Sequence, residues 1–438
     1  MLDKNFCSSP WFHVKLASDG TFLPCRWGNN QSAQRTQNIK FVSMSDYYNS
    51  QEMKDLRSSL LNGEFNNHCQ VCYYEESFGK LNGRLRQLNK SAIDANNFDL
   101  TARSSPHWDN FKFSFDNQGL ANLSPVDLQL DLGNTCNSAC IMCDPRSSSR
   151  LEKDYEKLNR IEPNIFKKSE SYRSWSQDQS VVDKFVDELG KIKNLRYLHF
   201  LGGETLFEQS FYQICDRLID LGLAKDIIIG TTTNGTIFND KIINYIKNFK
   251  QFHLGISIES VSALNDYIRY PSQIGNVISN IHKFLDLRNV YDSLYISLRI
   301  TPNVFTIFEL DKLFVFMLEN NVIAESCNIL YDPECLRIEL LPDDLKQQVL
   351  QKLEDLIDYY QLEKSHVVNI RRNDLIDQVI ANNILDYYNV VKNFQVPANV
   401  EDLRVDLVKF IKSFESLRDN SILDYLPEYE NFLRSYGF

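Results

Sequence analysis

The sequence predicts an α/β fold, because strand-like apolar runs alternate with helix-like runs through the middle of its 438 residues. The predicted strands are 126–132, 195–201, 226–232, 252–258, 294–300 and 326–332. The predicted helices lie near 181–193, 206–222, 239–249, 274–289 and 307–320. This repeating order fits an incomplete β/α barrel as well as an open doubly wound sheet.

The regions on either side of these units differ from them and from each other. Residues 1–120 are rich in Asn, Ser and Gln, show few periodic runs and carry four cysteines, which indicates a loop-rich module with an internal staple. After Pro342 the apolar residues recur at three-four spacing, as in "DDLKQQVLQKLEDLIDYY", which predicts amphipathic helices. We therefore expect three modules, at 1–120, 121–341 and 342–438.

Composition excludes several functional classes. A formal charge of −11 argues against a protein that binds nucleic acid mainly through its phosphates. No run approaches the ~18 apolar residues of a membrane span, and no secretory signal is visible, so we expect a cytoplasmic protein without a membrane partner. In that reducing compartment, the ten cysteines are better explained as metal ligands or catalytic groups than as disulfides.

Three cysteines lie close together in "GNTCNSACIMCDPRSSS", residues 133–149. Cys136, Cys140 and Cys143 follow the first predicted strand of the α/β region, and the loops at this end of the strands carry the chemistry of β/α barrels. Three thiolates can bind three irons of a 4Fe–4S cluster and leave the fourth iron open, whereas structural zinc takes four ligands. There are two alternatives. The cysteines could belong to a zinc knuckle that a distant ligand completes, or they could be small residues packed in the protein without a metal.

The stretch "CNSACIMC" resembles the cluster-binding motif of the radical S-adenosylmethionine (SAM) superfamily, with Met142 where an aromatic residue is usual. The resemblance implies a partial (β/α)6 TIM-like barrel and a 4Fe–4S cluster whose open iron is chelated by SAM. It also implies an enzyme that cleaves SAM reductively to methionine and a 5′-deoxyadenosyl radical, which abstracts a substrate hydrogen. The electron would come from a donor such as flavodoxin or ferredoxin.

Two short motifs after later strands carry the same resemblance. Gly202, Gly203 and Glu204 match the superfamily motif that receives the amino group of SAM, and glycines allow the backbone to approach a ligand closely. Asn234 precedes Gly235 after the third strand, where its amide can face the cofactor. A simple turn is the alternative interpretation of each motif.

Three further residues are candidate cofactor contacts. Ser257 and Glu259 lie two positions apart and therefore face the same side, where they can hold ribose hydroxyls. Arg299 is a candidate for the SAM carboxylate by the same resemblance, with Arg269 as its competitor. Structural salt bridges are the alternative explanation for these residues.

The four early cysteines predict a second metal site. A hairpin around Ser18–Gly20 would bring Cys7 near Cys25, and the pair Cys69 and Cys72 can close the site around iron–sulfur or zinc. The C-x12-G-x4-C stretch and "CQVC" resemble the auxiliary-cluster modules called SPASM and twitch domains. The resemblance implies a second 4Fe–4S cluster, with zinc as the alternative, in a single-cluster twitch module placed before the barrel.

Other thiols and the substrate are less constrained. Cys215 lies in a helical pattern and is expected in the core, whereas Cys327, Tyr331 and Cys335 lie at the predicted sixth strand as candidate hydrogen-atom donors. Because SPASM and twitch enzymes often modify peptides, the resemblance favours a peptide or protein side chain as substrate. The alternatives are a small-molecule substrate (sugar, nucleotide or amino acid) and a non-catalytic zinc or iron–sulfur protein that binds a partner or senses redox state.

Overall fold

The computed structural model describes residues 5–26, 37–77, 106–163, 165–166, 174–192, 195–324, 327–360 and 374–438. Within them, the strands form an open, mostly parallel sheet in the order β2-β1-β3-β4-β5-β6-β7-β8. The strands are β1 His13–Leu16, β2 Phe22–Leu23, β3 Asp127–Asp131, β4 Tyr197–Leu201, β5 Ile228–Thr233, β6 Gln251–Ser257, β7 Leu294–Arg299 and β8 Ile323–Ala324.

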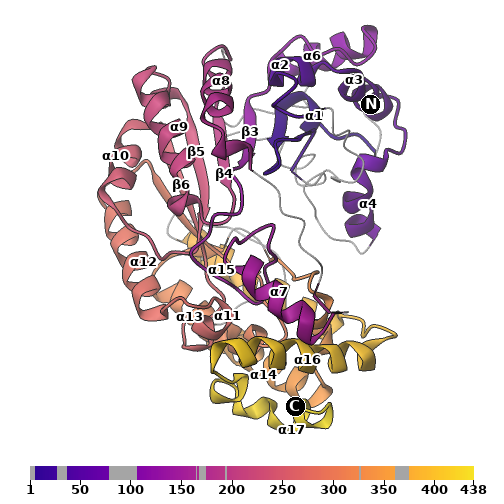
Figure 1. Ribbon diagram of the computed structural model, residues 1–438, viewed down its shortest axis with the longest axis vertical. Coiled ribbons are helices and arrows are strands. Elements are labelled where there is room, and N and C mark those ends of the chain that lie inside the picture. The colour runs from indigo at the N-terminus through magenta and orange to yellow at the C-terminus, as the bar shows by residue number, and fades with distance from the viewer. Residues whose placement is uncertain are drawn as a thin grey trace. The chain divides into compact units, whose positions relative to one another are not determined.

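Helices connect and flank these strands (Figure 1). Before β3 they are α1 Ser9–Phe12, α2 Met44–Tyr48, α3 Gln51–Leu61, α4 Gln70–Ser77 and α6 Pro106–Asp116. Between β3 and β8 they are α7 Leu151–Ile161, α8 Gln179–Leu189, α9 Gln209–Asp220, α10 Asp240–Asn248, α11 Leu264–Ile268, α12 Ile274–Arg288 and α13 Leu310–Glu319. The last are α14 Asp343–Tyr359, α15 Asp374–Asn393, α16 Val400–Arg418 and α17 Glu430–Ser435.

The predicted alternation is confirmed for the first five strands, which correspond to β3 to β7, and for the helices between them. The sixth prediction is wrong, because β8 covers Ile323–Ala324 and residues 327–332 form no strand. There the backbone N–H and C=O of Asn328 bond to the hydroxyl of Tyr387 at 3.0 and 3.1 Å. A side chain thus takes the place of the strand partner, which sequence periodicity does not reveal. Residues 193 and 326, which fall in two predicted elements, lie outside the described residues.

The predicted N-terminal hairpin is confirmed, and it also extends the sheet. β1 pairs antiparallel with β2, and the turn between them contains Gly20 at φ 90°. The other edge of β1 pairs parallel with β3, with His13 opposite Asp127. The N-terminal cysteine region is therefore joined to the sheet by backbone hydrogen bonds.

The chain divides into two compact units. Unit 1 contains residues 1–133, 172–230 and 247–252, and unit 2 contains residues 134–171, 231–246 and 253–438. The three modules expected from the sequence stay a prediction. No helix within the described ranges is long and apolar enough to cross a membrane.

A buried arginine organises the N-terminal part of unit 1. The Arg57 side chain on α3 is fully buried, and its guanidinium donates to the carbonyl oxygens of Pro10, Tyr48 and Gly119 at 2.7 to 3.2 Å. It also lies over the Tyr48 ring, 4.4 Å from the centroid. One side chain therefore satisfies backbone acceptors from three separate segments, as buried carbonyl groups require.

In unit 2 the C-terminal helices pack against the segment that follows the three-cysteine loop. Helix α16 lies beside α7 (Figure 1), and the Phe166 ring stacks on Phe410 and meets Phe414 edge-on, with centroids 5.2 and 5.6 Å apart. Tyr155 of α7 contacts the same Phe166 ring. The predicted C-terminal helices are therefore confirmed in their described part, and they reach the neighbourhood of the cysteines.

We expect Arg57→Met to lower the free energy of unfolding by at least about 3 kcal/mol, because the substitution leaves buried carbonyl oxygens without donors. Urea unfolding of the purified protein measures this change. The control is Arg217→Met, since the Arg217 side chain is 55% exposed and its ion pair with Asp187 is long, at 3.8 Å. The control should stay within about 0.5 kcal/mol of wild type. Equal effects of the two substitutions would contradict the role given to Arg57.

Candidate iron–sulfur and cofactor site

The three cysteines of the 133–149 stretch lie together in unit 2 on a segment without helix or strand. Cys140 is buried, and Cys136 and Cys143 are half-buried. The Cys143 N–H donates to the Cys140 carbonyl at 3.1 Å, and this hydrogen bond closes a turn that contains both cysteines. The Cys140 and Cys143 thiols share a hydrogen bond, and Cys136 is near enough for its charge to act on Cys143. The structure thus brings the three predicted ligands together.

Charge around this loop favours a thiolate at Cys140. The hydrogen bond from Cys143 lowers the pKa of Cys140 to about 7, against the effect of burial and with the help of the Arg269 charge. The pKa of Cys143 is raised, first by the same hydrogen bond and then by burial. A lowered pKa favours the thiolate of Cys140, and the thiolate is the form that binds metal.

The donor set fits three corners of a 4Fe–4S cluster, which is held by cysteine thiolates. As they stand, no three or more His, Cys, Asp or Glu side chains in the described ranges are arranged to hold a metal ion. In a tetrahedral zinc site the Zn–S bonds are about 2.3 Å long, so that neighbouring sulfur atoms lie only about 3.8 Å from each other. The three adjacent thiols and the arginine beside them are the features that match a cluster.

Asn234 fixes one side of the cysteine loop. Its Nδ2 donates to Asn137 Oδ1 at 2.7 Å and to Ser138 Oγ at 2.9 Å, while its Oδ1 accepts the Thr236 N–H at 3.0 Å. Gly235 next to it has φ 74°, and a Cβ there would lie 3.0 Å from side-chain atoms of its neighbours. The polar atoms of the predicted cofactor residue Asn234 are thus directed at the cysteine loop.

The end of α11 and the residues that follow it fix the other side of the loop. The Ala139 N–H donates to the Tyr270 carbonyl at 2.6 Å, and the Ile141 N–H donates to the Ile268 carbonyl at 2.9 Å. The two donors lie on alternate residues of the loop, as in a pair of β-strands, although neither segment is a strand. Cys140, between the two donors, is thereby held at a defined position.

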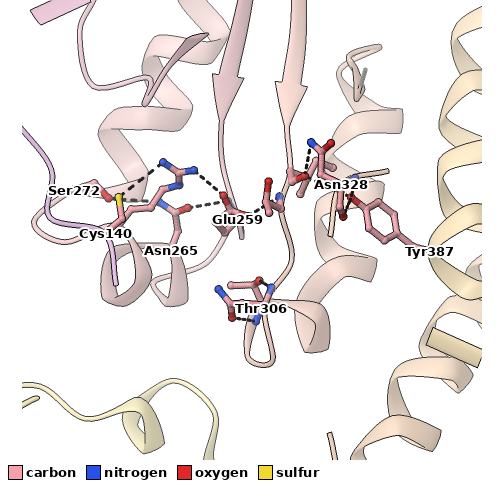
Figure 2. A network of polar contacts seen from close by, with 11 residues as sticks. Cys140, Glu259, Asn265, Ser272, Thr306, Asn328 and Tyr387 are labelled. Carbon is pink, nitrogen blue, oxygen red and sulfur yellow. Dashed lines mark hydrogen bonds and ion pairs between the residues drawn. The ribbon is translucent and has the colours of Figure 1, made fainter. Parts of the chain in front are cut away.

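A buried ion pair links the ends of β6 and β7 to Cys140 (Figure 2). Glu259 Oε1 accepts from Arg269 Nη2 at 2.6 Å, its Oε2 accepts the Thr301 N–H at 2.9 Å, and Arg269 Nη1 lies 4.0 Å from Cys140 Sγ. Burial raises the pKa of Glu259 against the pull of Arg269. The pKa of Arg269 is raised, because Glu259 and the thiols outweigh its burial. Asn265 Oδ1 also accepts the Glu259 N–H, at 3.1 Å.

The remaining predicted contacts in unit 2 lie on the strands themselves. Arg299 ends β7, and its side chain crosses Gly255 of β6, where a Cβ would lie only 2.6 Å from Arg299 Nε. Ser257 ends β6 and is half-buried. Gly255 therefore provides the space that the arginine side chain needs, a role that was not predicted.

The Gly-Gly-Glu motif belongs to unit 1. Gly202 has φ 152° and packs so closely that a Cβ would lie 3.1 Å from the Gly133 carbonyl oxygen, and Gly203 follows it in the same bend after β4. Glu204 is 1% exposed, and its Oε1 accepts the Leu206 N–H at 3.0 Å. The glycines thus form a close-packed bend, and the carboxylate begins a short 3-10 helix at Thr205–Phe207, while contact with the cofactor stays a prediction.

The four early cysteines also gather, within unit 1. Burial raises the pKa of Cys7, and the charges of Cys25, Cys69 and Cys72 all act on it in the same direction. Cys25 follows β2, whereas Cys69 lies just before α4 and Cys72 lies in its first turn. Because these thiols come from two distant segments, their proximity matches the arrangement that the spacing predicts. Their metal stays a prediction.

Other polar groups next to these cysteines were missed by sequence reasoning. Glu52 Oε1 lies 3.6 Å from His68 Nε2, and burial raises the pKa of Glu52. The pKa of Tyr47 is raised by burial and also by the charges of Glu52 and Cys25. In the sequence, the positions of Tyr47 and Glu52 on successive helices were the clue to these polar groups. The same spacing also fits ordinary helix packing.

The remaining candidates differ in their surroundings. Cys215 is fully buried in α9, which confirms its place in the core. Cys335 is buried, and burial raises its pKa to about 12. Cys327 is half-buried and forms a hydrogen bond with the hydroxyl of Tyr387, whereas Tyr331 is 45% exposed. A role as hydrogen-atom donor stays a prediction for Cys327, Tyr331 and Cys335.

We expect Asn234→Ala to lower the free energy of unfolding by roughly 1–3 kcal/mol, because Asn137, Ser138 and Thr236 lose a buried partner. Urea unfolding of metal-free protein measures this loss without any contribution from a cofactor. Asn389→Ala, at an exposed position of α15, is the matched control and should change stability by less than about 0.5 kcal/mol. A loss no larger than that of the control would refute the positioning role of Asn234.

Comparison with solved structures gives distant similarities. Native anSMEcpe with bound AdoMet is 16% identical with a TM-score of 0.38, and the match covers 53% of this chain and 60% of that chain. SuiB of Streptococcus suis bound to the precursor peptide SuiA is 14% identical with a TM-score of 0.34, with 71% and 63% covered. The chain thus spans 60% of the length of the first of these structures. No curated protein matches the chain.

The family model described as the radical SAM superfamily matches residues 130–301. This range contains the three-cysteine loop, the Gly-Gly-Glu motif, Asn234, and the Glu259–Arg269 pair. Over residues 130–301 the chain is thus similar to the radical SAM superfamily, whose enzymes use a 4Fe–4S cluster and SAM.

Proposed function

We propose that this protein cleaves SAM reductively and uses the resulting radical to modify a peptide or protein side chain. The observation that carries the proposal is the proximity of the Cys136, Cys140 and Cys143 thiols inside the range matched by the family model. Three thiolates on a four-iron cluster leave one iron for a further ligand. In the superfamily that ligand is SAM.

The cofactors supply the difficult chemistry, and the protein supplies position and electrostatics. When bound, the cluster and SAM together yield methionine and a 5′-deoxyadenosyl radical, after one electron arrives from a donor such as flavodoxin or ferredoxin. The chain holds the three sulfurs through Asn234 and the Ile268–Tyr270 backbone. Arg269 places positive charge beside Cys140, and Glu259 fixes the orientation of Arg269.

The SAM contacts divide into two groups in this proposal. Asn234 and Glu259 act mainly by holding the cysteine loop and Arg269, because their polar atoms bond within the protein. Ser257, Arg299 and the motif Gly202–Glu204 are the proposed direct contacts to the cofactor. Their support is the position of each at the end of a strand, where β/α enzymes bind ligands.

We assign a second 4Fe–4S cluster to Cys7, Cys25, Cys69 and Cys72. The support is their mutual proximity in unit 1 and the cysteine pattern of a twitch module. Four thiolates ligate such a cluster completely, so this cluster would exchange electrons or anchor substrate without binding SAM. Zinc is the alternative metal.

The peptide substrate is inferred from the twitch-like cysteine pattern. A peptide that adds a strand to a sheet needs an unpaired edge. At the N-terminal edge of the sheet, β2 is two residues long, and the Phe22 N–H already donates to the Gln37 carbonyl at 2.9 Å. The proposal therefore does not place the peptide on β2.

We expect anaerobically reconstituted protein to bind about eight irons, as two four-iron clusters require, and to form 5′-deoxyadenosine from SAM after reduction with dithionite. Cys140→Ala should abolish this product and lower the iron content to about four, because one cluster loses a ligand. Iron analysis and chromatography measure both effects. The control is Cys215→Ala in the core of α9, which should keep both clusters and SAM cleavage. Zinc without turnover in the wild type would favour a non-catalytic metal protein.

A short peptide encoded beside the gene should increase 5′-deoxyadenosine formation, because substrate consumes the radical productively. Mass spectrometry should then locate a mass change on one residue of the peptide. The comparison set contains sugars, nucleotides and free amino acids at equal concentration. Stimulation by one of these compounds, with none by the peptide, would show that the enzyme acts on a small molecule.

A further inference from the structure

The C-terminal helix α16 ends at a buried arginine that no motif of the sequence singles out. The Arg418 side chain is 2% exposed, and Asp419 after it adopts a left-handed conformation with φ 51°, which ends the helix. On one face of α16, Leu407, Ile411, Phe414 and Arg418 follow one another at four-, three- and four-residue spacing. Arg418 thus occupies a core position of an otherwise apolar stripe.

Arg418 contacts the three-cysteine loop directly. Its Nη2 donates to the carbonyl oxygen of Ala139 at 2.5 Å, and Ala139 immediately precedes Cys140. The guanidinium carbon lies over the rings of Tyr270 and Phe414, 4.9 and 4.3 Å from their centroids. Arg418 therefore touches both the loop and the segment to which the loop is bonded.

A second residue of the same helix turn supports that segment. Glu415 Oε1 accepts the hydroxyl of Tyr267 at 3.1 Å and also accepts the Ile422 N–H at 2.6 Å. Tyr267 directly precedes Ile268, whose carbonyl accepts the Ile141 N–H of the loop. Helix α16 consequently supports the cysteine loop by a direct route and through α11.

The guanidinium of Arg418 is not fully paired by the described residues. Among them, its Nε and Nη1 are buried and have no hydrogen-bond acceptor, and the Asp154 carboxylate lies 4.0 Å from Nη2. A buried positive charge with unused donors is costly unless an anion compensates it. A 4Fe–4S cluster with its thiolates is such an anion, and Arg418 lies near enough to Cys140 for the two charges to interact.

We propose that α16 forms a wall of the cluster site and that Arg418 both positions the cysteine loop and compensates the negative charge of the cluster. This inference rests on the proposed function, because it assigns a cluster to that loop. Reduction adds one electron to the cluster, and a nearby positive charge stabilises the reduced form. Arg418 therefore makes the cluster easier to reduce, which is the electron transfer that SAM cleavage requires.

Three variants of the full chain separate these effects. Arg418→Gln removes the charge, and Arg418→Lys keeps the charge but removes the planar fork. Arg404→Gln is the matched control, since Arg404 lies on the same helix and is 14% exposed. Arg404 also bonds to backbone carbonyls, at Leu340 and Leu341, so its loss disturbs the packing of α16 away from the loop.

The first measurement is the midpoint reduction potential of the cluster. It is obtained from a redox titration without SAM, in which electron paramagnetic resonance monitors the reduced cluster. The signal that changes on later addition of SAM identifies the cluster of the three-cysteine loop. We expect a more negative potential in Arg418→Gln and a near wild-type potential in Arg418→Lys and Arg404→Gln. A wild-type potential in Arg418→Gln, or an equal shift in Arg404→Gln, would overturn the charge compensation.

The second measurement uses metal-free protein and therefore does not depend on the cluster. Hydrogen exchange of the Ala139 and Ile141 amides should be faster in both Arg418 variants than in Arg404→Gln, because the loop loses its direct contact with α16. Equal exchange in all variants would overturn the positioning role. A wild-type protein without a SAM-responsive cluster would instead refute the proposed function, and the exchange comparison would still test the contact.

Discussion

The site depends on hydrogen bonds that hold an irregular, buried loop. Residues 132–150 form no helix or strand, and yet Ala139, Cys140 and Ile141 are at most 4% exposed. Buried backbone groups need partners, and this irregular segment supplies only some of them to itself. For Ala139 and Ile141 the partners come from the Ile268–Tyr270 backbone and from Arg418, and Asn234 bonds to the side chain of Ser138. The position of the loop around Cys140 is thus partly fixed by segments far away in the sequence.

Electrostatic balance is the second requirement of this site. The proposed cluster and its thiolates would bring negative charge into a buried region, which is unfavourable without nearby cations. Arg269 and Arg418 both lie close enough to act on Cys140, and Glu259 pairs with Arg269. The Thr301 N–H completes the surroundings of Glu259. The loop therefore combines backbone bonds that fix geometry with arginines that offset charge, and Arg418 does both.

Much of this structure could be predicted from the local periodicity of apolar residues and from the spacing of the cysteines. The strands from 127 to 299 alternate with amphipathic helices, so periodicity located them within a few residues. The cysteine spacing likewise indicated which thiols lie together. Sequence reasoning failed where side chains replace regular pairing, as at Asn328, whose backbone bonds to Tyr387 instead of a strand. It also missed Arg418, although a charged residue on the apolar stripe of α16 was a readable signal.

The contact between Arg418 and Ala139 spans 279 residues of sequence. During synthesis the ribosome releases the cysteine loop long before it releases the end of α16. The nascent loop consequently lacks one of its supports, and its sulfurs have not yet reached their final arrangement. A loop geometry that includes this contact can therefore form only after α16 has been synthesised.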